Sequence, residues 1–367
     1  MKTYSLLLLA FLVSYSSLSQ STLNRPQTPT PPFYYNIEDV TFKNIQDSVT
    51  LAGTLTFPKD GSNFPAAVLI SGSGAQNRNE EIMGHKLFWV LADFLTKQGI
   101  AVLRYDDRGT AESTGSFAEA LTQDFAKDVE AAVDFLKTRP EINQEAIGLI
   151  GHSEGGVIAP MVASNRPEDI GFIVLLAGVT IPGDTLMKLQ KELSLRSMGS
   201  SETYIEQELL FDTQLMPIIT TTPIDKLSES LKDFTTEYLN NHPEFVKTRG
   251  MTAEAYTNTL VASYTNPWFY NFINYNPSSA LQNTKCPILA LNGTNDTQVP
   301  SKENLDALKQ LKLSYPEKNI TTKAYPKLNH LFQESVTGSV FEYGRIEQTI
   351  APYVLVDISS WINSVVE

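Results

Sequence analysis

Short apolar runs alternate with amphipathic stretches along most of this chain, and this alternation is the feature that most constrains its fold. Apolar runs with the length of buried strands lie at residues 66–70, 101–105, 147–150 and 173–176. Stretches with helical spacing of apolar residues lie at 85–98, 121–137 and 155–163. A strand–helix–strand order of this kind builds a mostly parallel sheet with helices on its faces, so the predicted class is α/β. Residues 40–42 and 49–57 predict two antiparallel strands ahead of the parallel ones.

The alternation stops near residue 180 and resumes with a further buried-strand pattern at 288–291. The intervening residues, 180–280, have a polar and helical pattern and are expected to form an insertion. An insertion at this point would fall over the carboxyl ends of the strands, so we expect a helical lid. Its aromatic cluster includes Trp268, Phe269 and Phe272, which are candidate residues of a substrate pocket wall. Aromatic residues at this spacing also form ordinary hydrophobic packing, and both interpretations stay open.

The N-terminal residues have the pattern of a secretory signal peptide. Lys2 precedes an apolar run at 6–13, and small and polar residues lead to a cleavage site after Ser19. The alternative is a membrane anchor, but the run is far shorter than the roughly 20 residues that span a bilayer. We therefore expect an exported protein, periplasmic or secreted, without a stable membrane anchor. The expected organisation is a signal peptide at 1–19, a Pro/Thr-rich tether at 20–34, the first part of the α/β core at 35–179, the helical lid insertion at 180–280 and the second part of the core at 281–367.

The charge balance disfavours some classes of partner. The chain has 41 acidic and 28 basic residues, which gives a net charge of −13. An acidic surface disfavours nucleic acid and anionic membranes as partners. Cys286 is the single cysteine, so the fold has no internal disulfide. None of these features specifies an oligomeric state.

Residues 151–156 read Gly-His-Ser-Glu-Gly-Gly and directly follow the strand pattern at 147–150. A serine between two glycines at the end of a buried strand can lie on a turn so sharp that its hydroxyl projects above the sheet. Gly151 and Gly155 leave room where a Cβ would collide with the backbone, while Ser153 is driven to positive φ. The motif predicts that Ser153 is a nucleophile, although an ordinary strand-to-helix turn would also explain it.

A nucleophilic serine needs a base, and histidine is the side chain that titrates near neutrality. His152 must point away from the nucleophile beside it, His85 lies near a predicted helix start and His242 lies in the insertion. His330 remains, on a loop after a strand pattern at 321–325. This position lies at the carboxyl edge of the sheet and favours His330 as the base; a solvated loop histidine is the alternative.

The base in turn needs a carboxylate that fixes its tautomer. In this topology the expected chain order is serine, acid, histidine, with the acid after a late strand. Asp296 has that position because it follows the strand pattern that ends at Leu291. An aspartate in an ordinary turn is one alternative, and Asp184 is the rival position for the acid.

The developing oxyanion requires backbone N–H donors. One is expected from Glu154, the residue after the nucleophile, and the other from Ser73 in the sequence Ser-Gly-Ser-Gly at 71–74. The same Gly-x-Gly resembles a nucleotide-binding loop, but Asn77 stands where a third glycine is needed. No HExxH motif, paired cysteines or histidine cluster indicates a metal, and we expect no cofactor.

In this order the motifs resemble those of the α/β-hydrolase superfamily, and most closely the exported bacterial serine carboxylesterases related to the catalytic domain of prolyl oligopeptidases. The resemblance covers nearly all of the chain after the signal peptide. Its motifs are Ser71-Gly72-Ser73-Gly74, Gly84-His85-Lys86, Arg104-Tyr105-Asp106-Asp107-Arg108-Gly109, Gly-His-Ser-Glu-Gly at 151–155, Pro267-Trp268-Phe269, Asn-Gly-x-x-Asp at 292–296 and Asn329-His330-Leu331-Phe332-Gln333.

The resemblance implies an α/β-hydrolase fold in which Ser153, Asp296 and His330 act as nucleophile, orienting acid and general base. It also implies that Asp107 braces a structural loop at Arg108 rather than reacting. One departure is the sequence Gln-Asn-Arg-Asn-Glu at 76–80, where such esterases often carry aspartates in place of the asparagines. This departure puts a charge-dependent role of that loop in doubt.

The implied activity is hydrolysis of a small-molecule carboxylic ester through an acyl-enzyme. The alternative among enzymes is a serine peptidase of the oligopeptidase or aminopeptidase kind, although residues 20–60 leave no room for the N-terminal propeller of such peptidases. A thioesterase acting on coenzyme A esters is disfavoured for an exported protein. An alternative of another class is a catalytically inert binding protein with a hydrolase fold, which the three competent residues argue against.

Overall fold

The computed structural model describes residues 24–247 and 249–366, so the predicted signal peptide at 1–19 lies outside the described residues. The described chain forms two compact units. Pro182–Tyr275 form one, which we call the helical unit; the residues up to Ile181 and from Asn276 onward form the other, the sheet unit. The expected insertion, 180–280, is a few residues wider than the helical unit at each end.

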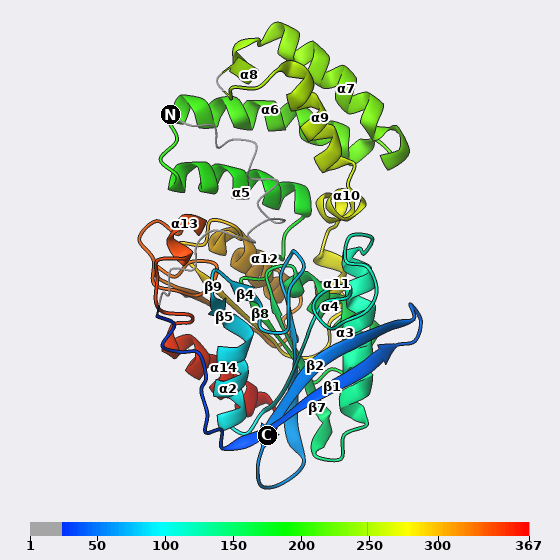
Figure 1. The fold of residues 1–367 in the computed structure, drawn as a ribbon, viewed down its shortest axis with the longest axis vertical. Helices are drawn as coiled ribbons and strands as arrows, with labels where there is room; N and C mark the ends of the chain where they lie inside the picture. Colours follow the sequence, from blue (N-terminus) through cyan, green and yellow to red (C-terminus); the bar gives the residue numbers. More distant parts are fainter. Residues whose placement is uncertain (1–23, 248, 367) are drawn as a thin grey trace. The chain divides into compact units, whose positions relative to one another are not determined.

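The sheet unit is built on an eight-stranded sheet with the order β1-β2-β6-β3-β7-β8-β9-β10 (Figure 1). Its strands are β1 Tyr35–Asn44, β2 Val49–Pro58, β3 Phe64–Ile70, β6 Ala101–Tyr105, β7 Ile142–His152, β8 Phe172–Leu176, β9 Ile288–Gly293 and β10 Ile320–Tyr325. The β1–β2 and β2–β6 pairs are antiparallel and the other pairs are parallel. The predicted α/β class, with a mostly parallel sheet, is confirmed.

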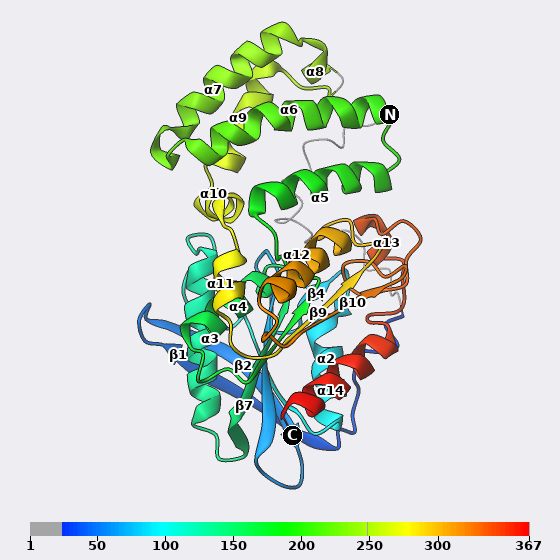
Figure 2. The ribbon, with the colours of Figure 1, turned by 180° about the vertical axis from the view of Figure 1, so that it is seen from behind.

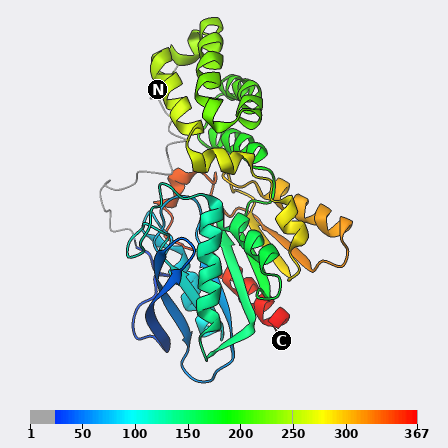
Figure 3. The same ribbon diagram turned by 90° about the vertical axis from the view of Figure 1, so that its right-hand side faces the viewer.

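Helices cover both faces of this sheet. The helices α2 (Leu87–Lys97) and α14 (Pro352–Val366) share one hydrophobic core with side chains of β3, β6, β7, β8 and β9. The helices α3 (Thr122–Lys137) and α4 (Gly155–Asn165) cover the opposite face (Figure 3), and α12 (Ser301–Ser314) packs on β9 and β10 (Figure 2). Two short helices, α11 (Ser278–Asn283) and α13 (Val340–Tyr343), complete the unit.

The helix expected from residue 85 begins two residues later, at Leu87. Residues 85–86 instead form β5 (His85–Lys86), which pairs antiparallel with β4 (Glu81–Ile82) in a small separate hairpin. The His85 side chain is fully buried, with Nδ1 2.9 Å from Thr349 Oγ1 and Nε2 3.0 Å from the Tyr343 carbonyl oxygen. These contacts hold His85 in the interior, against the segment that connects β10 to α14.

The strand order creates a switch point at β3. The crossover through α2 leads from β3 to its neighbour β6, and the crossover through α3 leads from β6 back to β7, on the other side of β3. In open parallel sheets, ligand sites lie outside the carboxyl ends of the strands at such a point. The loops after β3, β7, β9 and β10 carry Ser73, Ser153, Asp296 and His330, so all four predicted positions lie at this edge.

The helical unit has a hydrophobic core of its own, which contains Phe211, Leu231 and Phe269. Its helices are α5 Gly183–Ser197, α6 Glu202–Thr221, α7 Ile224–Asn241, α8 Glu244–Lys247, α9 Ala253–Tyr264 and α10 Pro267–Asn274. The two ends of the unit are joined, because the Gly183 N–H donates to the Tyr275 carbonyl at 3.0 Å. A lid placed over the sheet remains a prediction. Among the described residues, no helix combines the length and apolarity needed to cross a membrane.

The described part of the expected tether, residues 24–34, contacts the sheet unit. The Arg25 guanidinium donates to the carbonyl oxygens of Ile346 and Met83, at 2.6 and 2.9 Å. The Gln27 side-chain amide donates to the Ile350 carbonyl and accepts from the Thr349 N–H. These hydrogen bonds fix the segment to the loop that precedes α14 and to the turn between β4 and β5.

Candidate active site

The nucleophile candidate lies on a strained turn between β7 and α4. Ser153 has a φ of 53°, and its N–H donates to the Leu176 carbonyl at 3.0 Å. A Cβ at Gly151 would lie 2.0 Å from the Gly155 carbonyl oxygen, and a Cβ at Gly155 would lie 2.2 Å from the Ile70 carbonyl oxygen. Both glycines are therefore needed for clearance, and a non-glycine residue at positive φ is the kind of strain that collects at functional sites.

The structure brings His330 and Asp296 together. His330 Nδ1 lies 2.8 Å from Asp296 Oδ2, and both side chains are buried. The other carboxylate oxygen, Oδ1, accepts the N–H groups of Gln298 and Val299 at 2.8 and 2.9 Å. Because the carboxylate holds the proton on Nδ1, a neutral His330 ring carries its lone pair on Nε2, the nitrogen that can act as a base.

The rival acid has a different environment. Asp184 lies in the first turn of α5, in the helical unit, where its Oδ1 accepts the Thr185 N–H at 2.6 Å and the Thr185 hydroxyl at 3.2 Å. A carboxylate in the first turn of a helix satisfies otherwise unpaired backbone donors, so the geometry gives Asp184 a local role.

Close backbone packing aligns the acid loop with the base loop. A Cβ at Gly293 would lie 2.1 Å from the Leu328 carbonyl oxygen, which itself accepts the Asn295 N–H at 2.9 Å. The buried Asn329 side chain closes the base loop, since its Oδ1 accepts the N–H groups of Leu331 and Gln333 at 3.0 and 2.9 Å. The glycine in the Asn-Gly-x-x-Asp motif thus allows the two loops to touch.

Replacement of Gly293 with alanine is expected to push the base loop away from the acid loop. The added methyl group would meet backbone rather than a movable side chain. We expect kcat for the proposed reaction to fall by about 10²-fold and the free energy of unfolding to fall by about 1–3 kcal/mol. Kinetics and urea unfolding measure the two effects. Gly344→Ala is the matched control, because its Cβ would meet only Met83 Sδ at 3.4 Å; equal losses in both variants would contradict this role of Gly293.

The predicted oxyanion loop after β3 lies against the nucleophile. A Cβ at Gly72 would lie 3.1 Å from Ser153 Cβ, so glycine permits the close approach. The loop is fixed on both sides of Ser73: the Ser71 hydroxyl donates to Asp107 Oδ1 at 2.6 Å, and the Gln76 N–H donates to Asp107 Oδ2 at 2.9 Å. Burial raises the pKa of Asp107 to about 8, against the opposing effect of these hydrogen bonds. The Ser73 and Glu154 amides remain the predicted oxyanion donors.

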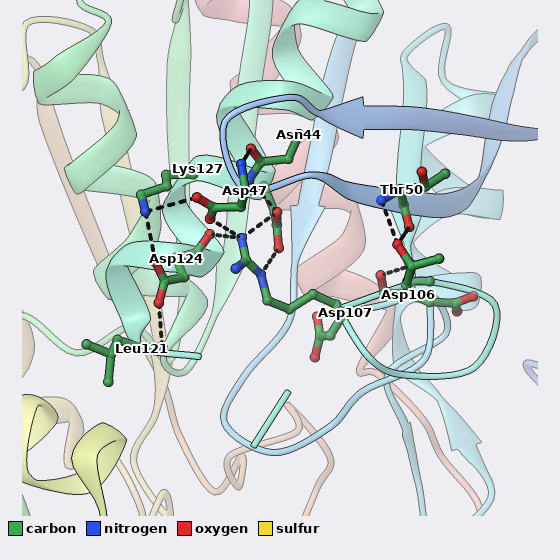
Figure 4. Close-up of polar contacts among 12 residues, drawn as sticks. Asn44, Asp47, Thr50, Asp106, Asp107, Leu121, Asp124 and Lys127 are labelled. Carbon is green, nitrogen blue, oxygen red and sulfur yellow. Dashed lines mark hydrogen bonds and ion pairs between the residues drawn. The ribbon is translucent and has the colours of Figure 1, made fainter. Parts of the chain in front are cut away.

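Ion pairs hold the loop after β6 in place. Arg108 Nε donates to Asp128 Oδ2 at 2.7 Å, and Arg108 Nη2 lies 3.0 Å from Asp47 Oδ2. Figure 4 shows Asp47 and Asp124 beside Lys127. These ion pairs tie the loop to α3 and to the β1–β2 hairpin, and Asp107 contacts the loop after β3.

Glu80 is a buried site residue that the sequence pattern did not indicate. Its Oε1 accepts the Gly72 N–H at 2.8 Å and lies 2.8 Å from His152 Nδ1. The His152 Nε2 lies 3.0 Å from the His330 carbonyl oxygen. The asparagines that depart from the esterase pattern have polar partners of their own, since Asn79 Oδ1 accepts from Arg104. The negative charge at this end of the loop therefore comes from Glu80.

The candidate pocket residues of the insertion lie on α10. Phe269 belongs to the hydrophobic core of the helical unit, with its ring 5.4 Å from the Tyr264 ring. Trp268 stacks on Phe272 with ring centroids 5.5 Å apart. These contacts are packing within the helical unit, and a role in substrate binding stays a prediction. Within residues 24–247 and 249–366, no group of three or more His, Cys, Asp or Glu side chains is arranged to hold a metal ion.

A mostly parallel sheet with a strained serine after β7 and a His–Asp pair after the last two strands defines an α/β-hydrolase. The chain belongs to the family described as serine aminopeptidase, S33, whose pattern matches residues 85–334. Among curated proteins it is similar to the esterase EstD of Thermotoga maritima, at 26% identity over 300 residues, which covers 82% of this chain and 62% of EstD. The chain thus spans about three fifths of the length of that relative.

Two solved structures share the fold. The Pyrococcus furiosus esterase Pf2001 superposes with a TM-score of 0.53 at 15% identity, covering 95% of this chain and 99% of that one. The structure of Est1E from Butyrivibrio proteoclasticus with bound ferulic acid superposes with a TM-score of 0.51 at 14% identity, covering 89% and 99%. At these identities the likeness establishes the α/β-hydrolase fold. The predicted relation to the prolyl oligopeptidase catalytic domain stays a prediction.

Proposed function

We propose that this protein is a serine hydrolase that cleaves small-molecule carboxylic esters. The observation that carries the proposal is the buried hydrogen bond between His330 Nδ1 and Asp296 Oδ2, at the sheet edge that also holds the strained Ser153. A carboxylate-oriented imidazole and a serine held on a strained turn are the parts of a nucleophilic acyl-transfer site.

The proposed reaction has two steps. Ser153 Oγ attacks the ester carbonyl carbon while His330 Nε2 accepts the hydroxyl proton, and the backbone N–H groups of Ser73 and Glu154 stabilise the oxyanion. His330 then returns the proton to the alcohol oxygen as the bond between acyl carbon and alcohol breaks. Water attacks the acyl-enzyme with His330 again as base, which releases the acid and restores the serine.

Two sets of relatives favour different bonds. The similarity to EstD, Pf2001 and Est1E, all named as esterases, supports an ester substrate, and the ferulic acid bound to Est1E makes aromatic acyl groups worth testing. The family description, serine aminopeptidase, supports a peptide bond as the second candidate. An ester has the better leaving group, so we place ester hydrolysis first.

Labelling with a fluorophosphonate followed by a substrate panel tests the proposal on the purified full chain. We expect the label on Ser153, located by mass spectrometry, and turnover of nitrophenyl esters and feruloylated sugars above that of aminoacyl nitroanilides. Higher turnover of the nitroanilides would favour the peptidase. A chain that neither takes the label nor turns over any substrate would be the inert binding protein.

We also propose that the protein is exported. The support is the sequence alone: Lys2, the apolar run at 6–13 and the small residues up to Ser19. N-terminal sequencing of the protein recovered from a periplasmic or extracellular fraction is expected to begin at Gln20. Recovery of a chain that still begins at Met1, in the cytoplasm or the membrane, would contradict export.

A further inference from the structure

Three segments of the proposed active site meet at one buried side chain, His152. It directly precedes Ser153 on the nucleophile turn and is 1% exposed. On one side its Nδ1 contacts Glu80, which also binds the Gly72 N–H of the oxyanion loop. On the other side its Nε2 contacts the His330 carbonyl oxygen of the base loop, and the two imidazole rings lie 4.7 Å apart between centroids. One imidazole ring therefore links the nucleophile turn to the oxyanion loop and to the base loop.

The hydrogen-bond partners specify where the protons of His152 lie. A carbonyl oxygen only accepts, so the nitrogen 3.0 Å from the His330 carbonyl, Nε2, must carry a proton. A proton must also lie between Nδ1 and Glu80 Oε1, which are 2.8 Å apart. Oε1 also accepts the Gly72 N–H at 2.8 Å, as a carboxylate oxygen does, and this favours the second proton on Nδ1. The geometry thus favours a doubly protonated His152, an imidazolium paired with a carboxylate.

We propose that His152 and Glu80 form a buried imidazolium–carboxylate pair that positions the oxyanion loop and the base loop on the nucleophile turn. The proposal rests on the proposed function, in which Ser153 and His330 react. Both members of the pair are positioning residues, because they act through Gly72 and the His330 backbone rather than on the substrate.

The charges around the His152 ring favour its protonated, positively charged form. Burial by itself lowers the pKa of His152, but the negative charge of Glu80 and its hydrogen bond raise it above the usual histidine value; the His330 carbonyl and the charge of Asp296 act in the same direction. The facing titratable groups are thus Glu80, Asp296 and the His330 ring. Since the pKa is raised in the folded state, the stabilising contribution of the pair is complete below the ordinary histidine pKa. It is lost as the pH rises through the raised value.

A variant that removes the charge but keeps the shape separates this role from simple packing. Glu80 Oε2 has no hydrogen-bond partner among the described residues, so Glu80→Gln can leave Oε1 in place for the Gly72 N–H. Without the carboxylate, a buried imidazolium would be uncompensated and His152 would lose a proton. A neutral imidazole donates from one nitrogen only, so one of the two contacts of the ring is lost.

Nitrogen NMR of the full chain labelled with ¹⁵N-histidine tests the protonation state. We expect both ring nitrogens of His152 to carry protons at pH 7 in the wild type and one nitrogen to lose its proton in Glu80→Gln. The His152 signals are assigned by their absence in His152→Gln and their presence in His85→Gln. A neutral His152 ring in the wild type overturns the proposal, and this readout does not depend on any catalytic activity.

Kinetics test the positioning role. We expect Glu80→Gln and His152→Gln to lower kcat by about 10²-fold with little change in KM. We also expect the wild-type kcat to fall at alkaline pH, over the range in which the NMR signals of His152 show loss of a ring proton. In Glu80→Gln this fall in kcat is expected at lower pH. His85→Gln is the matched control, because His85 is a fully buried histidine with two hydrogen-bonded nitrogens and no bond to the three loops.

The outcomes separate the two proposals. An unchanged kcat in Glu80→Gln, or an equal loss in His85→Gln, overturns the positioning role even if His152 is an imidazolium. A wild-type protein that neither hydrolyses esters nor reacts with fluorophosphonate overturns the proposed function, while the NMR spectra still report on the ion pair.

Discussion

We expect the replacement of Ser153 with alanine to lower the turnover of esters by about four to six orders of magnitude. The variant loses the only atom that forms the acyl-enzyme, while the backbone donors and the bound substrate geometry remain. Alanine also tolerates the turn about as well as serine does, because the strain at a φ of 53° comes from the Cβ that both residues carry. The fold should therefore survive, and kcat measured with the best ester of the panel reports the chemistry.

Ser164→Ala is the matched control for this variant. Ser164 lies in α4, the helix that follows the nucleophile, and its hydroxyl donates to the Met161 carbonyl of the same helix. We expect its rate to stay within about twofold of the wild type, as for most substitutions without a buried or catalytic role. If Ser153→Ala retained more than a few per cent of the wild-type rate, the acyl-enzyme mechanism would be wrong.

Replacement of Asp296 with asparagine is expected to lower kcat by about 10⁴-fold, because it changes which ring nitrogen of His330 carries the proton. The Oδ1 position accepts two backbone N–H groups, from Gln298 and Val299, so the asparagine oxygen stays there and the NH2 group faces His330. His330 Nδ1 then accepts instead of donating, and the ring proton moves to Nε2. An Nε2 that carries a proton cannot take one from Ser153.

The asparagine variant preserves most of the folded structure, since the backbone hydrogen bonds of the acid loop are kept. Its melting temperature should therefore change far less than its rate. Asp306→Asn is the matched control, because Asp306 pairs with two lysines on the exposed face of α12. A loss in Asp296→Asn below about tenfold would mean that another group orients His330.

Much of the fold follows from local sequence patterns. The central strands are continuous apolar runs, as expected for a sheet covered on both faces, and β8 and β9 are fully buried along their length. The antiparallel start could be predicted only in part: the strand expected at 40–42 is the end of β1, Tyr35–Asn44, in which less and more exposed residues alternate. The first helix was displaced because two residues before Leu87 pair in a hairpin, and such short pairing has no periodic signal.

The predicted site residues could be ordered along the chain because each follows a strand of the same parallel sheet. His330 was predicted by elimination among four histidines, and in the structure its Nδ1 contacts the Asp296 carboxylate. Glu80 could not be found in this way, since it lies 72 residues from His152 in sequence and its role depends on three loops meeting. Its φ of 46° is likewise set by tertiary contacts, not by a local pattern.

The sequence pattern also predicted an insertion, and the two ends of the helical unit lie next to each other. Gly183 and Tyr275 are joined by a backbone hydrogen bond, and a Cβ at Gly183 would lie 2.0 Å from the Phe272 carbonyl oxygen. The strands on either side, β8 and β9, pair directly with each other. Because the two ends of the helical unit are joined to each other and the flanking strands pair directly, the unit could be exchanged as one piece while β8 and β9 keep their hydrogen bonds.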